Sequence, residues 1–493
     1  MSLKGEINKM IKTPKPENVM KIFFDLTKIP RGSGNMDKVA EYCENFAKKH
    51  NLWYIRDEKN NVIIKKDASA GYENYKSVIL QGHLDMVCEK ESDCTIDFLN
   101  DPLLIDSDGG YIFAKGTTLG ADDGIAVAYI LAVLEDDTIK HPPLEALFTT
   151  DEETGMDGAI ALDTSLLEGK MLLNIDSEEE GIFTVSCAGG MNVSCNIPIS
   201  FGNSYDTVFD IRIYNLLGGH SGVEIDKKRA NANILAGALL DEICTKTNVG
   251  LVKINGGKKH NAIPTECIFS VCCHDKEAIE NITKDFLEKI REKYKGIEPD
   301  IKIEIKTSNK QALSISAEDT KRFAKALSKM PDGVKSLSED ILGLVKTSSN
   351  LGILTTNENG IYMLSSVRSS DEREKEEYSD EIFNHMMTLG DDVKKSDEYP
   401  AWEYKSKSYL RDKATEIFEK MYNKKPVTQA IHAGLECGIF SSKIKGLDAI
   451  SFGPDIKDIH TPKERLSIAS AERTWEFLIE LLKELKVEKS DCI

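Results

Sequence analysis

Short apolar segments that end directly in acidic or imidazole side chains constrain the fold of this chain more than any other feature. Four of these segments have the length and composition of buried strands, and they cover residues 78–80, 144–148, 171–175 and 449–452. Helical stretches separate them, and residues 124–135 (GIAVAYILAVLE) are apolar on nearly every side. Strands that alternate with helices predict an α/β fold with a mainly parallel sheet flanked by helices.

The middle of the chain has a different pattern. Residues 207–214 alternate apolar and polar side chains, and helices are predicted at about 227–243 and 279–290. Two strands flank the turn Asn255-Gly256-Gly257, and another strand follows the second helix. The resulting order, β-α-β-β-α-β, is the ferredoxin-like arrangement. Residues 310–390 add helices and strands that indicate a partial second copy.

These two patterns predict one discontinuous domain that is interrupted by an insertion. A chain of 493 residues exceeds what a single hydrophobic core usually serves. We expect the α/β domain at 1–190 and 396–493, and the α+β, ferredoxin-like insertion at 191–395.

Composition limits the classes of partner. A formal net charge of −19 argues against nucleic acid or an anionic membrane, because both attract basic surfaces. No segment approaches the roughly 18 consecutive apolar residues of a membrane-spanning helix. The 11 cysteines are scattered without a CxxC pair, which is typical of reduced thiols in the cytoplasm. We therefore expect a cytoplasmic protein without nucleic acid or membrane partners.

Polar side chains follow each predicted strand of the α/β domain at the point where the strand ends. Ligands of open parallel sheets bind beyond the carboxyl ends of the strands, so these side chains are expected to face one crevice. An acidic pair also lies just before the apolar helix. The residues concerned are His83, Asp85, Asp122, Asp123, Glu152, Glu153, Asp176 and His460.

Carboxylates gathered in one crevice repel one another unless a cation neutralises them. Two histidines among them favour zinc or a similar transition ion, and such a set suits two metals with one bridging carboxylate. Of the adjacent pair Glu152 and Glu153, one side chain can bind metal while the other takes a proton from water. Asp85 suits a different task, accepting the second ring N–H of His83. Each acidic loop alone would be ordinary solvated surface, and their shared position favours the metal site.

Several sequence blocks also resemble one known family. These blocks are LQGHLDMV, GTTLGADDGIAVA, TTDEETGMDGA, NIDSEEEG, GGHSGVEI, NAIP, HAGLECG and a late SFGP followed by a histidine. They are similar to the bacterial aminoacyl-histidine dipeptidases, cytosolic non-specific dipeptidases of the di-zinc aminoacylase/carboxypeptidase superfamily. The resemblance runs along almost the whole chain and implies a zinc-peptidase-like catalytic domain with an inserted lid.

The resemblance also implies roles for individual residues. One zinc would be held by His83, Asp122 and Asp176, and Asp122 would bridge to a second zinc. The remaining implied roles are metal ligation by Glu153 and His460, catalysis by Glu152 as base with Asp85 and His220, and substrate binding by Asn261, Arg368, Gly434 and Glu436. Co²⁺ or Mn²⁺ would be substitutes for the two zinc ions.

We therefore expect metal-dependent hydrolysis of unblocked dipeptides, Xaa-His among them, through a water held by two zinc ions. A tripeptide aminopeptidase or an N-acyl amino acid hydrolase on the same scaffold is one alternative. A metal-stabilised binding protein without turnover is another, although such a protein would have no use for both Glu152 and Glu153. The expected partner is a small peptide, and a homodimer is compatible with the sequence.

Overall fold

The computed structural model describes residues 13–205, 207–308, 312–341 and 343–490. Contacts divide the chain into two compact units. The first contains the chain up to Val185, Lys405–Gln429 and the chain from Ile439 onward. The second contains Ser186–Tyr404 and Ala430–Gly438. No helix among the described residues is long and apolar enough to cross a membrane.

The sequence-based boundaries at 190 and 395 lie about five and nine residues from those at Val185 and Tyr404. The segment Ala430–Gly438 was expected in the α/β domain, whereas the contacts group it with the second unit. Its His432 Nε2 lies 2.7 Å from Ser348 Oγ, and Ala188 N–H donates to the Ile431 and Ala433 carbonyls at 3.1 Å each. These bonds depend on the folded chain, and no pattern in the sequence indicates them.

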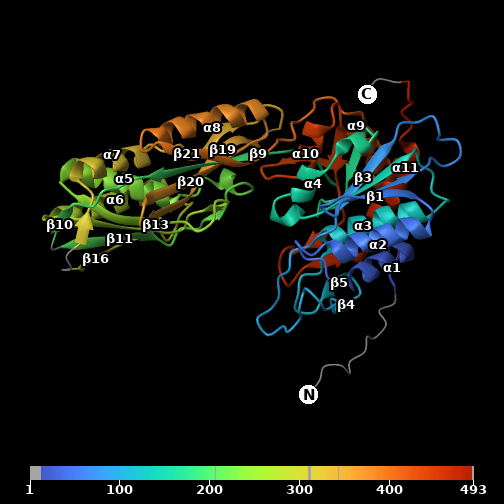
Figure 1. The fold of residues 1–493 in the computed structure, drawn as a ribbon, viewed down its shortest axis with the longest axis horizontal. Helices are drawn as coiled ribbons and strands as arrows, with labels where there is room; N and C mark the ends of the chain where they lie inside the picture. Colours follow the sequence, from blue (N-terminus) through green and yellow to red (C-terminus); the bar gives the residue numbers. More distant parts are fainter. Residues whose placement is uncertain (1–12, 206, 309–311, 342, 491–493) are drawn as a thin grey trace, which may run out of the picture. The chain divides into compact units, whose positions relative to one another are not determined.

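An eight-stranded sheet forms the centre of the first unit (Figure 1). The four central strands are parallel, β1 and β2 continue the sheet antiparallel on one side, and β8 pairs antiparallel with β23 on the other, so the predicted parallel arrangement applies to the centre. The strand order is β1 (Trp53–Arg56), β2 (Val62–Lys66), β6 (Leu144–Thr149), β3 (Val78–His83), β7 (Met171–Asn174), β23 (Asp448–Ser451), β8 (Ile182–Cys187) and β22 (Val427–Ile431).

Helices pack against this sheet, with α2 on β1 and β2, α3 on β3, and α9 on β23. Helix α3 is buried along almost its whole length, which explains why it is apolar on every side. The helices of this unit are α1 (Glu17–Leu26), α2 (Asp37–Lys49), α3 (Ala121–Glu135), α4 (Asp157–Ala161), α9 (Tyr409–Tyr422) and α11 (Ile468–Glu484), and α10 (Glu436–Lys443) begins in the segment that the contacts group with the second unit. A small sheet contains β24 (Ile456–Lys457), β25 (Arg465–Ser467), β5 (Tyr111–Ala114) and β4 (Ile105–Ser107).

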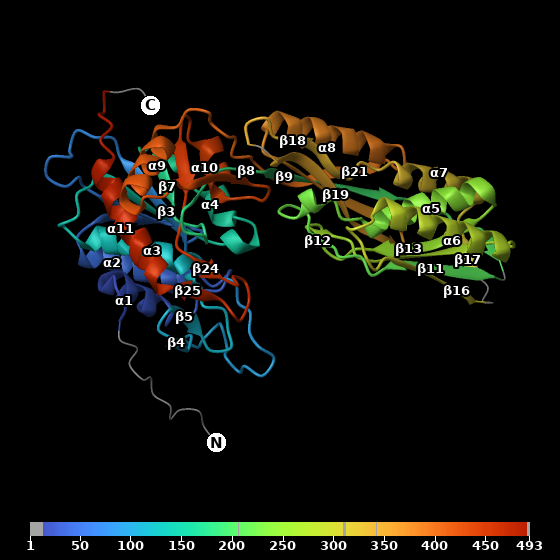
Figure 2. The ribbon, with the colours of Figure 1, turned by 180° about the vertical axis from the view of Figure 1, so that it is seen from behind.

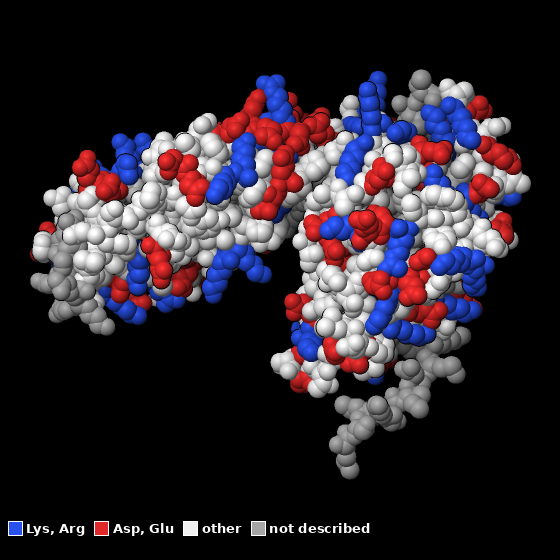
Figure 3. All heavy atoms as spheres, in the orientation of Figure 1, with Lys and Arg blue, Asp and Glu red and all other residues white. Residues whose placement is uncertain are grey.

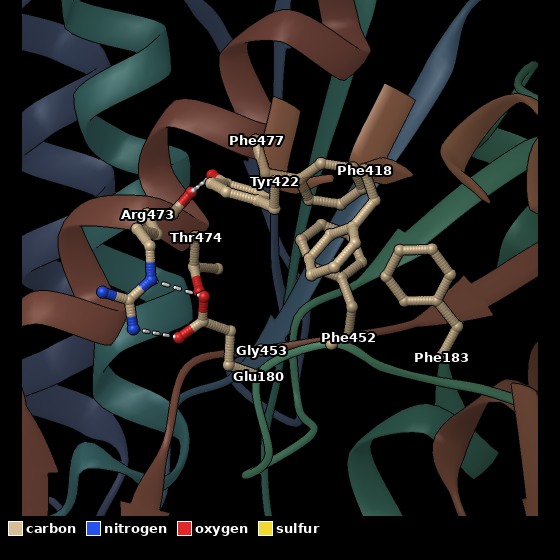
Figure 4. Close-up of a pocket in the computed structure, with 10 residues that line it drawn as sticks. Glu180, Phe183, Phe418, Tyr422, Phe452, Gly453, Arg473, Thr474 and Phe477 are labelled. Carbon is tan, nitrogen blue, oxygen red and sulfur yellow. Dashed lines mark hydrogen bonds and ion pairs between the residues drawn. The ribbon is translucent and has the colours of Figure 1, made fainter. Parts of the chain in front are cut away.

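Aromatic packing attaches the late segment of the chain to the first unit (Figure 4). The ring of Phe183 in β8 contacts Phe418 of α9 and Phe477 of α11, each with centroids 5.5–5.6 Å apart. Beside these rings, Arg473 forms a bidentate ion pair with Glu180 at 2.5 and 2.6 Å. Residues far apart in sequence therefore build one core, as a discontinuous domain requires.

The second unit is built on a nine-stranded sheet whose pairs are antiparallel, with its helices along one face (Figures 1 and 2). The strand order is β16 (Lys302–Ser308), β11 (Val208–Tyr214), β15 (Cys267–Cys272), β13 (Gly250–Gly256), β19 (Val345–Asn357), β20 (Gly360–Ser369), β9 (Gly189–Ile197) and β21 (Asp392–Tyr399), with β18 (Gly333–Leu337) on β19. The helices are α5 (Ala232–Lys246), α6 (Lys276–Lys293), α7 (Ala317–Ser328) and α8 (Glu372–Met387). Short pairs join β12 (Gly219–His220) to β14 (Ala262–Ile263) and β10 (Asn203–Tyr205) to β17 (Ala312–Ser314).

This sheet contains two ferredoxin-like arrangements side by side. The first follows the predicted order through β11, α5, β13, β15, α6 and β16. The second runs through β9, α7, β19, β20, α8 and β21, and its strands have the same neighbour relations. The predicted partial second copy is therefore complete, because its first strand, β9, precedes the first copy in sequence. One continuous apolar core lies under both.

Candidate metal centre

The first unit brings its predicted polar residues to one edge of the sheet. His83 is the last residue of β3, and Asp176 lies two residues after β7. Glu152 and Glu153 follow β6 in a 3-10 turn (Glu152–Thr154), and Asp122 lies in the first turn of α3. Because β6, β3 and β7 are parallel neighbours, their carboxyl ends meet at this edge.

Asp122 lies between the two histidines. Its Oδ1 is 3.1 Å from His83 Nε2, and its Oδ2 is 3.2 Å from His460 Nε2. His83 Nε2 is also 3.5 Å from Asp176 Oδ1, and His460 Nε2 is 3.1 Å from the Glu153 carboxylate. One carboxylate thus presents a separate oxygen to each of two donor sets, the arrangement of a bridging ligand.

Electrostatics at this edge favour positive charge on both imidazoles. Burial opposes the charged form of His83, yet hydrogen bonds to Asp122 and Asp176 raise its pKa well above the ordinary value. Hydrogen bonds to Asp122 and Glu153 raise the pKa of His460 to about 11. Burial raises the pKa of Asp176 to about 6. A metal cation can replace these protons, so the nitrogen and oxygen atoms gathered here are suitable ligands for a metal cation.

Asp85 orients more than one partner. Its Oδ1 lies 3.3 Å from His83 Nδ1, the second ring nitrogen, whose N–H it is predicted to accept. Its oxygens also accept hydrogen bonds from Ser33 Oγ at 2.8 Å and from the backbone N–H groups of Glu152 and Glu153 at 3.1 and 3.2 Å. One carboxylate therefore positions both the histidine and the turn that carries the two glutamates.

Asp123 was not assigned a role from the sequence. It is buried, and its Oδ2 accepts the backbone N–H of His83 at 3.1 Å. Ligand atoms of Asp123, His83 and Asp176 lie within 4.8 Å of one another, as do those of His83, Asp122 and Glu153. The adjacent acidic pair in the sequence was the available indication, but it did not distinguish the two residues.

A third acidic group belongs to the second unit and is explained by ion pairs. Figure 3 shows acidic side chains gathered over α8. Among them Glu372 and Glu398 lie 2.6 and 3.3 Å from the buried Lys375 ammonium, and Glu376 lies 3.1 Å from Lys395. Lysine cations already neutralise this cluster, so it needs no metal.

His220, predicted in the insertion, is held in one tautomer. Its Nδ1 accepts backbone N–H groups of Gly222 at 3.1 Å and Val223 at 3.2 Å, so the proton of the neutral ring is on Nε2. Glycine is required at position 222 in this conformation of the turn, because a side chain there would collide with the His432 carbonyl. Burial, followed by the charge of Arg368, lowers the pKa of His220. The ring is therefore a neutral hydrogen-bond donor.

Asn261 and Arg368 lie in the same unit as His220. Ser221 N–H donates to the Asn261 carbonyl at 2.9 Å, and the Asn350 amide supports this turn through the carbonyls flanking Asn261. Arg368, on β20, is buried and donates to Tyr399 Oη at 2.7 Å.

The HAGLECG segment contains the remaining two residues for which substrate contacts are predicted. Gly434 lies in the loop before α10, and Glu436 is the buried first residue of that helix. His432, also buried, was left without an assigned role. Burial, followed by the charge of Arg368, lowers its pKa to about 3, so its ring is neutral as well.

Comparison with known proteins identifies the family. The model of peptidase family M20/M25/M40 matches residues 79–484, most of the chain. The chain belongs to this peptidase family. The family prediction from the sequence is thereby confirmed, and so is the class of enzyme, a peptide hydrolase.

Relatives of this M20 peptidase cover nearly its whole length. It is 35% identical over 477 residues to the cytosol non-specific dipeptidase of Escherichia coli. This alignment covers 95% of this chain and 98% of the relative. The crystal structure of aminoacylhistidine dipeptidase from Vibrio alginolyticus superimposes with a TM-score of 0.89 at 35% identity, covering 97% and 98%. An M20 metallo-carboxypeptidase from Sulfolobus solfataricus has the same fold, with 14% identity, a TM-score of 0.53 and coverage of 95% of this chain and 99% of that one.

Proposed function

We propose that this M20 peptidase hydrolyses unblocked dipeptides of varied sequence, Xaa-His among them, with two zinc ions per chain. The observation that carries the metal centre is Asp122, whose two oxygens face His83 and His460 separately. Support for dipeptides comes from the 35% identical relatives named as dipeptidases. A cytoplasmic location is part of this proposal, supported by the free thiols of all ten cysteines that the structure describes.

Two cations would be held by residues of the first unit, with Asp122 shared. His83 and Asp176 would complete one set, and Glu153 and His460 the other. Bound divalent ions supply Lewis-acid charge and make water more acidic. Co²⁺ and Mn²⁺ suit the same mixture of imidazole and carboxylate donors.

The chain itself would supply proton transfer and orientation. Glu152 takes a proton from the attacking water and returns it to the leaving amine. Asp85 keeps Glu152 in place by accepting the backbone N–H of Glu152. His220 donates from Nε2 to the developing oxyanion, and Arg368 binds the substrate carboxylate with its planar guanidinium.

The remaining substrate contacts are assigned to Asn261, Gly434 and Glu436. The side chain of Asn261 would bind the substrate backbone. The Asn350 amide would hold Asn261 in position for this, because it donates to the carbonyls of the residues before and after Asn261. Gly434 and Glu436 would line the pocket for the substrate.

A substrate panel tests the proposed activity. Purified enzyme is incubated with free dipeptides, tripeptides and N-acetyl amino acids, with and without a chelator. We expect release of amino acids from dipeptides only, abolished by chelator and restored by zinc. Turnover of tripeptides alone would favour a tripeptide aminopeptidase, and turnover of acetylated compounds alone an N-acyl amino acid hydrolase. No turnover of any compound by the zinc-loaded protein would favour the binding protein without catalysis.

Substitution of His220 tests oxyanion stabilisation. His220→Ala should lower kcat by about 10²–10³-fold, because a preorganised donor is removed. Both metals should stay bound, since His220 belongs to the other unit. His260→Ala is the matched control, an exposed histidine of the same unit with no assigned role, and it should stay near wild type. Equal losses for the two variants would contradict the assignment.

Mixing two inactive variants tests whether each chain uses its own His220. The second ferredoxin-like copy makes this insertion large enough to occupy the place of a partner subunit. We therefore expect each chain to use its own His220. His220→Ala and Glu152→Gln proteins are combined under conditions of subunit exchange. Activity should stay at the sum of the two variants. Recovery well above that sum would show that a homodimer shares the histidine between chains.

A further inference from the structure

Two buried charges hold the turn that carries Asp122. They are Arg31, which follows α1, and Glu464, which lies four residues after His460. Both side chains are 2% exposed. Neither belongs to the ligand set proposed above, and neither was indicated by the sequence patterns.

Glu464 binds a run of consecutive backbone amides. Its Oε2 accepts the N–H groups of Leu119 at 2.7 Å and Gly120 at 3.0 Å. Its Oε1 accepts those of Ala121 at 2.7 Å and Asp122 at 3.4 Å. Successive N–H groups that converge on one carboxylate form an anion-binding concavity, and here the anion is part of the protein.

Arg31 binds the opposite side of the same turn. Its Nη2 donates to the Gly120 carbonyl, and its Nη1 donates to the carbonyls of Leu84 and Asp85 at 2.8 Å each. The Gly120 peptide is thus held through both its N–H and its C=O. Gly120 has a φ of +67°, and a Cβ there would lie 2.6 Å from Arg31 Nη2, so this approach requires glycine.

These bonds connect three segments that carry candidate ligands. Arg31 links Leu84 and Asp85, which directly follow His83 at the end of β3, to the Asp122 turn. Glu464 links that turn to the loop that carries His460, more than 300 residues away in the chain. Burying two charges is costly unless hydrogen bonds compensate for it, and here the bonds go to backbone atoms of the Asp122 turn and of Leu84 and Asp85.

We propose that Glu464 and Arg31 are positioning residues for Asp122, which keep one of its oxygens on His83 and the other on His460. This rests on the proposed two-metal centre. A misplaced turn would still leave every ligand in the chain, but the two donor sets would no longer share one carboxylate. The expected consequence is weaker binding of the cation pair, in the range of 10–100-fold typical when supporting hydrogen bonds of metal ligands are lost.

Glu464→Gln tests this, because the amide keeps the size but turns an NH₂ group toward N–H donors. Glu145→Gln is the matched control. Glu145 is also 2% exposed and accepts backbone N–H groups of Glu168 and Gly169, but it lies in β6 away from the polar edge, where Lys65 approaches it. Zinc affinity, bound zinc per chain and thermal unfolding of the metal-free protein are measured for wild type and both variants.

We expect Glu464→Gln to lose 10–100-fold in zinc affinity, to show an altered Co²⁺ absorption spectrum and to recover activity in excess zinc. Glu145→Gln should keep wild-type affinity and spectrum even if its metal-free form unfolds at a lower temperature. Should Glu464→Gln not fold, Arg31→Lys is used, since a single ammonium nitrogen cannot occupy the two separate positions from which Nη1 and Nη2 donate.

The outcomes separate the two proposals. Wild-type protein that binds no pair of cations would overturn the metal centre and the positioning role with it. Wild-type protein that binds two cations, with a substituted protein of unchanged affinity and spectrum, would overturn the positioning role alone. Affinity losses in both Glu464→Gln and Glu145→Gln that follow their losses of stability would also overturn it.

Discussion

Glu152→Gln is expected to bind both cations normally and to lose about 10²–10⁴-fold in turnover. The amide has the shape of the carboxylate but is too weak a base to take a proton from water. The turn itself should not move, because Asp85 holds it through the backbone N–H groups of Glu152 and Glu153. Metal content per chain and kcat on a free dipeptide are the two measurements.

Glu153→Gln is the matched control for this experiment. The two residues are neighbours in one 3-10 turn, and it is the Glu153 carboxylate that lies 3.1 Å from His460 Nε2. We expect the control to lose metal affinity and to regain turnover in excess zinc, whereas excess zinc should not restore Glu152→Gln. A Glu152→Gln enzyme with normal metal content and normal turnover would remove Glu152 from the mechanism.

Much of the first unit could be predicted because local signals and the fold agree. The apolar runs at β3, β6, β7 and β23 are each short, and each ends in polar residues. Parallel strands with buried centres require this pattern, so the polar ends indicated both the sheet and the edge where they would meet. Strand identity and site position were thus read from the same residues, and the family comparison confirms the fold.

The second unit exposed the limits of sequential reading. The first strand of its second ferredoxin-like arrangement is β9, which precedes the whole first arrangement in sequence. The second repeat is therefore not contiguous, and from the sequence it looked partial. Helix α5 begins at Ala232, not at about 227, because Lys228 has a φ of +53° and the Asn231 side chain caps the helix. The basic run at 227–229 is compatible with a helix, and only its backbone conformation excludes it.

The candidate site was predictable where residue type decides chemistry and hidden where only geometry does. Histidines and acids at strand ends indicated metal ligands, and the structure brings His83, Asp122, Asp176, Glu153 and His460 together. Their roles remain predictions. Arg31 and Glu464 are single charged residues without a spacing pattern, and their importance follows only from which backbone atoms they reach.

Asp122→Ala should have the most severe effect on metal binding, with loss of at least one cation at zinc concentrations that saturate the wild type. The substitution removes the only side chain whose two oxygens approach both His83 Nε2 and His460 Nε2, at 3.1 and 3.2 Å, among the described residues. Two cations close together would then repel each other without a shared carboxylate between them. Turnover should fall below detection, and excess zinc should not restore it.

Asp123→Ala distinguishes this effect from the loss of any buried carboxylate in the same turn. Asp123 is equally close in sequence, but its Oδ2 accepts the His83 backbone N–H, and no described contact joins it to His460. We expect Asp123→Ala to be less stable yet to bind two cations at saturating zinc, as counted by metal analysis. If Asp122→Ala retained two tightly bound ions while Asp123→Ala lost them, the shared ligand would be Asp123. Because both substitutions remove one carboxylate from one turn, charge alone cannot explain a difference between them, and the result reports which oxygen atoms the two cations share.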